Sequence, residues 1–291
     1  MKLEKIKKLK SSFYFLTNGE LIKRDNTLEF VDEEKNRTYL PIFQVNDLYI
    51  MSTVKITCDL LKLLSKNGIT IHYFDKYEYY LGSFYPVVNN NLNGNILVKQ
   101  VINFSNIETR LKLSKEVIIA CFKNMRRVVK NHFKDMPDKI QDTLTIFEKN
   151  TNKIYLCNTI NEIMLVEASM HKTYYAVWNE IFVDKNIVIV KREKRANSDL
   201  INSLISFINS LLYALIVSEI YKTSLNVTIS FLHEPSQSRV SLAYDIAEIF
   251  RPILVDRLIF YLVNKKIINL EDFDITINRL KESAVKKILY H

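Results

Sequence analysis

The chain contains little glycine, proline or cysteine for its length: 4 glycines, 5 prolines and 3 cysteines among 291 residues. Scarce glycine and proline exclude a disordered or linker-rich protein. Glycine-rich loops that hold nucleotide phosphates are also excluded, because neither G-x-G-x-x-G nor the Walker A pattern occurs. The three cysteines are widely spaced and form no C-x-x-C pair, so the sequence predicts neither a zinc motif nor a disulfide framework.

A long uninterrupted apolar run is also missing. The most apolar stretch, 200–220, is broken by asparagine, serine and glutamate side chains, which predicts a buried core helix rather than a membrane span. The opening segment MKLEKIKKLK has the positive charge of a signal peptide without its apolar core. We therefore expect a cytoplasmic protein that does not associate with a membrane.

Basic residues are in surplus, with 41 lysines and arginines against 32 acidic residues and a net charge of +9. A surplus of this size favours an anionic partner, either a nucleic acid or an anionic membrane. Hydrophobic residues make up 48% of the chain, so it can bury one large core or two ordinary ones without disulfide staples.

The hydrophobic pattern changes from short strands to helices along the chain, which predicts an α+β protein with two domains. Residues 1–88 are predicted to form a small β-rich domain with a hairpin at Asn18-Gly19 and one helix, starting near Val54, that ends at Asn67-Gly68. Residues 89–97 read as a linker, and 98–291 as an all-helical domain. Within it, we expect 101–134 to form one long helix and 274–290 to form a terminal helix.

The first domain is rich in tyrosine between residues 73 and 85. Aromatic side chains on strands can stack with nucleic acid bases. They more often pack within a sheet or at an interface, and we favour this second interpretation.

One histidine and three acids could converge on a single site. Asp245 and Glu248 are three residues apart and share a helix face, and His233 precedes that helix. Glu167 stands in an otherwise apolar helical segment, where a glutamate needs a partner. Two oxygens and one nitrogen from Glu167, His233 and Glu248 suit Mg²⁺ or Mn²⁺ better than zinc.

Each of these residues also has an ordinary structural explanation. His233 can be a structural histidine, and the acids of the 245–248 segment can form a solvated helix face. Glu167 can pair with Lys172 or Arg192 instead of binding a metal.

Basic side chains surround the acids in the sequence, and arginine matches phosphate oxygens with two parallel hydrogen bonds. A hard metal among phosphate-binding cations indicates a site that processes phosphodiesters. The predicted DNA-binding residues are Lys191, Arg192, Lys194, Arg195, Arg239 and Arg251.

Several segments resemble motifs of the CRISPR-associated spacer-acquisition integrase family, and the resemblance covers almost the whole chain. Glu167 stands in an aromatic-rich helix, and the chain departs from the family pattern at Ala168 and Ser230, where glycine is frequent. The other matching segments are Lys191 to Arg195, Phe231-Leu-His-Glu-Pro, Ser241-Leu-Ala-Tyr-Asp-Ile-Ala-Glu and Phe250-Arg-Pro-Ile-Leu-Val-Asp-Arg.

The resemblance implies a metal-dependent DNA endonuclease and integrase of CRISPR adaptation. It would join the 3′-hydroxyl ends of captured foreign DNA into the repeat array by transesterification. The metal ligands would be Glu167, His233 and Glu248, and Asp245 would support a ligand or a metal-bound water.

The implied partners are double-stranded DNA, a second copy of the chain bound through the β-rich domain, and a small ferredoxin-like adaptation subunit. Two alternatives stay open. One is a non-catalytic DNA-binding scaffold, and the other is a stand-alone metal-dependent nuclease.

Overall fold

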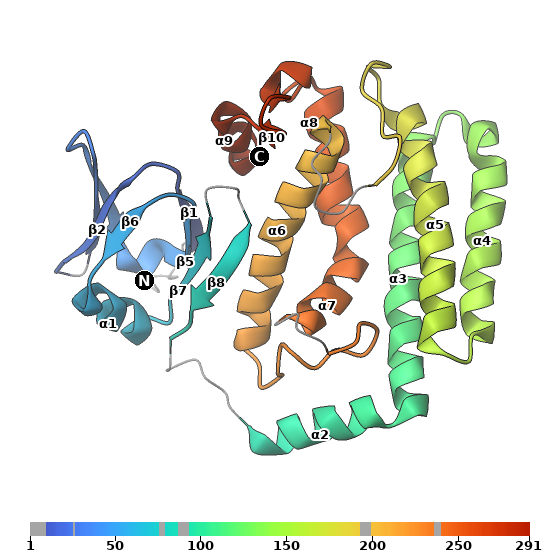
Figure 1. Cartoon of the computed structure of the whole chain (residues 1–291), viewed down its shortest axis with the longest axis horizontal. Helices are drawn as coiled ribbons and strands as arrows, with labels where there is room; N and C mark the ends of the chain where they lie inside the picture. The colour runs from blue at the N-terminus through green and yellow to red at the C-terminus, as the bar shows by residue number, and fades with distance from the viewer. Residues whose placement is uncertain (1–9, 26, 76–78, 87–92, 193–198, 236–239) are drawn as a thin grey trace, which may run out of the picture. The chain divides into compact units, whose positions relative to one another are not determined.

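The computed structural model describes residues 10–25, 27–75, 79–86, 93–192, 199–235 and 240–291. The chain divides into two compact units, Met1–Leu92 with Tyr221–Ser224, and Asn93–Ile220 with Leu225–His291. The first is rich in strands and the second is mostly helical, which confirms the predicted α+β class (Figure 1). The predicted boundaries at 1–88, 89–97 and 98–291 stay a prediction, since 89–92 lie outside the described residues.

Two four-stranded sheets form the first unit, in the orders β1-β5-β7-β8 and β4-β3-β2-β6. In the first sheet β1, β5 and β7 run parallel and β8 pairs antiparallel with β7. The strands are β1 (Ser11–Phe15), β2 (Gly19–Arg24), β3 (Thr27–Asp32), β4 (Arg37–Pro41), β5 (Val45–Ile50), β6 (Val54–Ile56), β7 (Thr70–Phe74) and β8 (Tyr80–Phe84).

The hairpin predicted at Asn18-Gly19 is wrong, because β1 and β2 belong to different sheets. The Gly19 N–H instead donates to the carbonyl of Thr53, and Asn18 Oδ1 accepts the Thr53 N–H. Gly19 is required there, because a Cβ would collide with the carbonyl of Val31. The chain therefore crosses from one sheet to the other at this point.

One helix, α1 (Cys58–Lys66), packs its Leu60 and Leu64 into the core of this unit. Its end at Asn67-Gly68 is confirmed: Gly68 has a φ of 68° and the Ile69 N–H donates to Leu64 O. The predicted start near Val54 is wrong, since Val54 lies in β6 and Thr57 is the N-cap.

Helices make up most of the second unit, with a short hairpin near its end. They are α2 (Gly94–Ser105), α3 (Ile107–His132), α4 (Gln141–Leu156), α5 (Ile160–Ile181), α6 (Leu200–Tyr221), α7 (Ser241–Arg251), α8 (Arg257–Asn264) and α9 (Glu282–Tyr290). Short turns of 3-10 helix cover Ile42–Gln44 in the first unit and Pro137–Ile140 and Leu270–Asp272 in the second.

The single helix predicted over 101–134 is wrong. Asn106 interrupts it with extended backbone angles, and its side chain accepts the Thr109 N–H at 2.8 Å as the N-cap of α3. Residues 94–97, assigned to the linker, begin α2. The terminal helix starts at Glu282 rather than 274, because β9 (Phe273–Asp274) and β10 (Arg279–Leu280) pair first.

The core of the second unit forms where α3 packs against α4, α5 and α7. Phe122 of α3 and Trp178 of α5 are completely buried within it. The most apolar helix, α6, is long and apolar enough to cross a membrane, but 72% of its apolar window is buried inside the protein. A mostly buried helix of this kind is typical of a core element, as the sequence predicted.

The segment after α7 continues as a π-helical turn, Pro252–Asp256, before α8 begins. Proline lacks the N–H that an α-helix needs, and π-helical turns are frequent beside functional sites. The turn buries Asp256, whose carboxylate accepts a hydrogen bond from Tyr174 Oη at 3.0 Å.

Candidate metal centre

Glu167 and His171 project from the same face of α5, since they are one helical turn apart. His171 Nε2 lies 3.0 Å from Glu167 Oε1 and 3.6 Å from Glu248 Oε2 of α7. The imidazole therefore stands between two carboxylates from different helices. Burial opposes its protonation, but the two carboxylates outweigh burial and raise its pKa above the ordinary value.

Glu248 uses its two oxygens differently. Oε1 forms an ion pair with Arg251 Nη1 at 2.6 Å, and Arg251 Nη2 donates to Tyr175 Oη at 3.0 Å. Oε2 is buried and accepts no hydrogen bond from any residue that the structure describes. Burial disfavours the charged form of Glu248, yet Arg251 and His171 hold its pKa at about 2, so it is a carboxylate at neutral pH.

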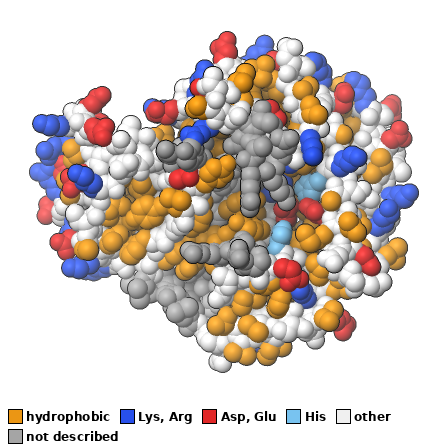
Figure 2. Space-filling view, in the orientation of Figure 1, with side chains coloured by type: hydrophobic (Ala, Val, Ile, Leu, Met, Phe, Trp, Pro, Cys, Tyr) orange, Lys and Arg blue, Asp and Glu red, His pale blue; other side chains and the backbone are white. Residues whose placement is uncertain are grey.

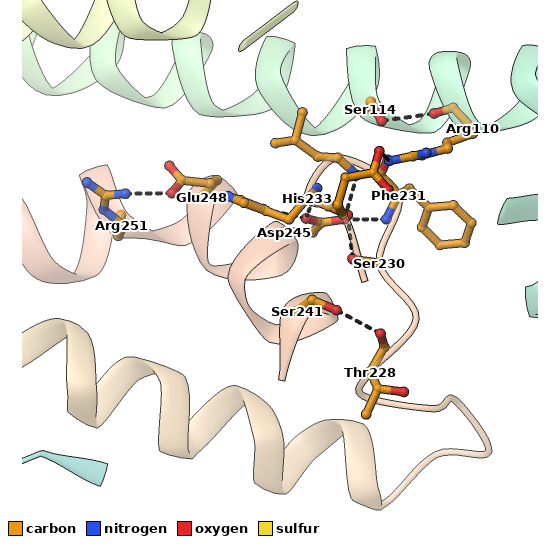
Figure 3. A network of polar contacts seen from close by, with 12 residues as sticks. Arg110, Ser114, Thr228, Ser230, Phe231, His233, Ser241, Asp245, Glu248 and Arg251 are labelled. Atoms are coloured by element: carbon orange, nitrogen blue, oxygen red, sulfur yellow. Dashed lines mark hydrogen bonds and ion pairs between the residues drawn. The ribbon is translucent and has the colours of Figure 1, made fainter. Parts of the chain in front are cut away.

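His233 lies in the segment before α7 and is held by Asp245 (Figure 3). Asp245 Oδ1 bonds the ring Nδ1 at 2.8 Å, and the carboxylate also accepts the backbone N–H groups of Phe231, Leu232 and His233. Because a carboxylate only accepts hydrogen bonds, Nδ1 carries the proton, and in the neutral ring the lone pair available to a metal is on Nε2. Metal-binding histidines in proteins are commonly arranged in this way.

Two residues that sequence reasoning missed brace the His233 segment from α2 and α3. The amide of Gln100 donates to the carbonyls of Asn226 and Ile229 and accepts the Asn226 N–H, at distances of 2.8 to 2.9 Å. Arg110 donates to Phe231 O at 2.8 Å, as Figure 3 shows. Because each partner is a backbone group of one short segment, these contacts fix its path.

The predicted ligands Glu167, His233 and Glu248 belong to one charged neighbourhood. Burial opposes protonation of His233, but Asp245 first, and then Glu248 and Glu167, raise its pKa. Figure 2 shows histidine side chains on either side of acidic ones on one face of the protein, with lysine or arginine nearby. The assignment of these three residues as ligands stays a prediction.

The residues present fit a hard divalent cation. They offer carboxylate oxygens from two helices, an imidazole held by its other nitrogen, and a buried Glu248 oxygen without a hydrogen-bond partner in the described parts of the chain. An unpaired buried oxygen costs stability unless a ligand fills it. Oxygen-rich sites of this kind select Mg²⁺ or Mn²⁺.

The predicted DNA-binding residues occupy different environments. Lys191 is exposed, whereas Arg192 is half-buried and donates to Asn202 and Ser206 of α6. Arg251 is only 14% exposed in its ion pair with Glu248, so it is not an exposed phosphate clamp. Lys194, Arg195 and Arg239 lie outside the described residues.

His171 was missed as a member of this cluster. As the alternative to metal binding, Glu167 could pair with Lys172 or Arg192; in the structure it lies beside His171 instead. The signal was available, because the residue four positions after a helical acid lies on the same face.

The sequence matches the family model of CRISPR-associated protein Cas1 over residues 13–291. It is 38% identical over 283 residues to a CRISPR-associated endonuclease Cas1 of Fusobacterium nucleatum, covering 97% of this chain and 83% of that protein. The structure of a Cas1 protein from Thermotoga maritima superposes with a TM-score of 0.84 at 32% identity, covering 96% of this chain and 88% of that one.

Two more distant structures share the fold. A casposase bound to an integration product has a TM-score of 0.77 at 22% identity, covering 97% of this chain and 80% of that one. A chain of a partial Cas6-RT-Cas1–Cas2 complex has a TM-score of 0.64 at 19% identity, covering 96% of this chain and 86% of that one. At these identities the similarity concerns the fold alone.

Proposed function

The chain belongs to the family of CRISPR-associated protein Cas1, and from this premise we propose that it is a metal-dependent DNA endonuclease and integrase of CRISPR adaptation. It would insert captured foreign DNA into the repeat array by transesterification at phosphorus. The observation that carries this proposal is the buried Oε2 of Glu248, which accepts no hydrogen bond in the described residues. His171 stands between it and Glu167, and a histidine fixed by Asp245 is in its electrostatic reach.

Glu167, His233 and Glu248 are the proposed ligands of Mg²⁺ or Mn²⁺. The cation would polarise the target phosphate and stabilise the charge that develops on the leaving oxygen. Asp245 would keep the His233 ring in the orientation and tautomer that leave Nε2 available. Arg251 would hold Glu248 ionised and in place through Oε1, leaving Oε2 for the ligand.

The reaction exchanges one phosphodiester bond for another. The 3′-hydroxyl of a captured fragment attacks phosphorus in the target strand, so its oxygen forms a new bond and the 3′-oxygen of the target strand leaves. A proton is lost from the attacking hydroxyl and one is gained by the leaving oxygen. With water as the nucleophile, the same site would act as an endonuclease.

The proposed partners follow from the named relatives and the charge. The net charge of +9 suits double-stranded DNA, with Lys191, Arg192 and the neighbouring basic residues on the phosphates. The Cas1–Cas2 complex among the structural neighbours supports assembly with a small adaptation subunit, which we expect to be ferredoxin-like. We also propose a cytoplasmic homodimer formed through the β-rich unit.

The experiment combines the purified protein, its small partner, a short duplex with free 3′-hydroxyls and a supercoiled repeat-bearing plasmid. With Mn²⁺ the duplex should join the plasmid, and without metal it should not. Glu167→Gln and Glu248→Gln should lower joining and cleavage at least about 10³-fold, because each removes a charged ligand. Glu282→Gln, which changes an exposed acid on α9, is the matched control.

The outcomes separate the alternatives. Metal-independent DNA binding without cleavage or joining would identify a scaffold. Cleavage without the partner, and no joining with it, would identify a stand-alone nuclease. Full joining activity by both glutamine variants with Mn²⁺ would exclude the proposed ligands.

A further inference from the structure

A second set of ligand atoms meets at Glu248, on the side of the core. The thiol of Cys121 on α3, the ring of His171 on α5 and the carboxylate of Glu248 on α7 place one potential ligand atom each within 4.8 Å of one another. Three separate helices contribute, and α3 packs directly against both α5 and α7. The cluster is therefore a product of the helical core and not of one flexible loop.

These atoms lack ordinary hydrogen bonds. Both ring nitrogens of His171 and Oε2 of Glu248 are buried without a hydrogen-bond partner in the described residues. Glu167 Oε1 is 3.0 Å from His171 Nε2, which gives an ion pair when the ring is protonated but not the geometry of a hydrogen bond. Cys121 is completely buried. Buried groups left this way cost free energy unless something binds them.

We propose that Cys121, His171 and Glu248 form a binding site for a borderline-soft divalent transition metal ion, of which Zn²⁺ is the representative. A sulfur, a nitrogen and an oxygen are a typical zinc donor set, and Cys121 selects against Mg²⁺ and Mn²⁺. Glu167 Oε1, 3.0 Å from His171 Nε2, is a further carboxylate oxygen beside the cluster. Sequence spacing could not reveal the site, because its ligands are separated by 50 and 77 positions.

Binding exchanges protons for metal–ligand bonds. Without a metal, burial first and then Glu248 raise the pKa of the Cys121 thiol well above its ordinary value, so the thiol keeps its proton. A bound dication reverses this, as the zinc–sulfur bond forms and the thiol proton goes to solvent. A ring proton of His171 is lost in the same way when its nitrogen becomes a ligand.

The two metals would compete, because both need Oε2 of Glu248. A zinc ion on the Cys121 side would occupy the oxygen that the proposed function assigns to Mg²⁺ or Mn²⁺. This consequence, inhibition by zinc, rests on the proposed function, whereas the binding of zinc does not.

The test uses Co²⁺ as a spectroscopic substitute for zinc, with full-length protein and no DNA. A Cys58→Ser background removes the exposed cysteine, and both remaining cysteines are buried. We expect an intense near-ultraviolet thiolate-to-cobalt charge-transfer band. Cys121→Ser should abolish the band, and Cys157→Ser, at the buried cysteine that follows α4 and donates to Lys153 O, should keep it.

Zinc affinity gives a second reading, by competition with a colorimetric chelator. Loss of a residue that only hydrogen-bonds to a metal ligand weakens metal binding about 10- to 100-fold. Cys121→Ser removes a direct ligand, so it should weaken Zn²⁺ binding by more than this. For the Cys58→Ser protein, which needs no core substitution, zinc X-ray absorption should find one sulfur at about 2.3 Å. No charge-transfer band, a band that survives Cys121→Ser, or a zinc ion without sulfur would each overturn the proposal.

The two proposals fail separately. A protein that shows the cobalt band but neither cuts nor joins DNA with Mn²⁺ contradicts the proposed function alone. A protein that joins DNA but shows no thiolate ligation contradicts the zinc site alone.

Discussion

Asp245 and Glu248 lie one turn apart on α7, and both are buried, yet their surroundings differ. Asp245 accepts four hydrogen bonds, three from backbone N–H groups and one from His233. Glu248 has one oxygen in an ion pair with Arg251. Its other oxygen accepts no hydrogen bond in the described chain, with His171 Nε2 3.6 Å away. One carboxylate is saturated and the other is half-filled.

This difference indicates that Asp245 and Glu248 have different roles. A saturated carboxylate has no capacity left for a ligand, so Asp245 holds the His233 segment in shape. The buried Glu248 carboxylate, with one oxygen that accepts no hydrogen bond, destabilises the folded state, and a bound cation would offset this destabilisation. Three measurements can break or sharpen this comparison.

The largest effect is expected for Asp245→Asn. The new amide group would point N–H donors at backbone N–H groups or at the His233 ring, leaving buried donors unsatisfied. We expect the free energy of unfolding to fall by about 4 kcal/mol, measured by urea denaturation. Asp59→Asn, at an exposed acid of α1, should change it by less than about 0.5 kcal/mol. If Asp245→Asn lowered the free energy of unfolding as little as Asp59→Asn does, the hydrogen bonds of Asp245 would not stabilise the His233 segment.

Asp256 is a third buried acid that accepts a hydrogen bond from Tyr174 and has no ion pair in the described residues. Burial raises its pKa from 3.8 to about 6. The folded state therefore keeps a proton that the unfolded chain has already released. The stability that this gives is complete below pH 3.8 and is lost as the pH rises through about 6.

Asp256→Asn should remove that dependence, because asparagine cannot ionise but can still accept from Tyr174. Between pH 3 and pH 7 the wild type should lose about 3 kcal/mol relative to the variant, in urea denaturation at a series of pH values. A difference between the two proteins that does not vary with pH would show that the pKa of Asp256 is not raised in the folded state.

Metal binding should stabilise the wild type through the unpartnered oxygen of Glu248. At a Mn²⁺ concentration of about 100 times the dissociation constant, the gain is about 2.7 kcal/mol, visible as a rise in Tm. Glu248→Gln should lose the gain, because an amide is a poor ligand for a hard cation. Glu282→Gln, at an exposed acid, should keep it. Equal stabilisation of the wild type and Glu248→Gln would place the cation elsewhere.

Much of this organisation was predictable from local patterns. Alternating and aromatic residues indicated the strands, and Asn67-Gly68 marked the end of α1. Helical spacing put Asp245 near Glu248. The apolar segment around Glu167 indicated that this acid needed a partner. The Asn18-Gly19 hairpin failed because a local turn signal does not say which sheet the next strand joins.

By itself, the amino-acid sequence determined the α+β class, the basic charge and the residue types able to bind a hard cation, because these depend on composition and short-range periodicity. Only the tertiary structure decided which oxygens stay free, since hydrogen bonds to Asp245 and the ion pair of Arg251 come from packing. Packing also brought Cys121 and His171 to Glu248 from separate helices. No spacing along the chain encodes such a meeting, because it depends on how the helices of the core cross.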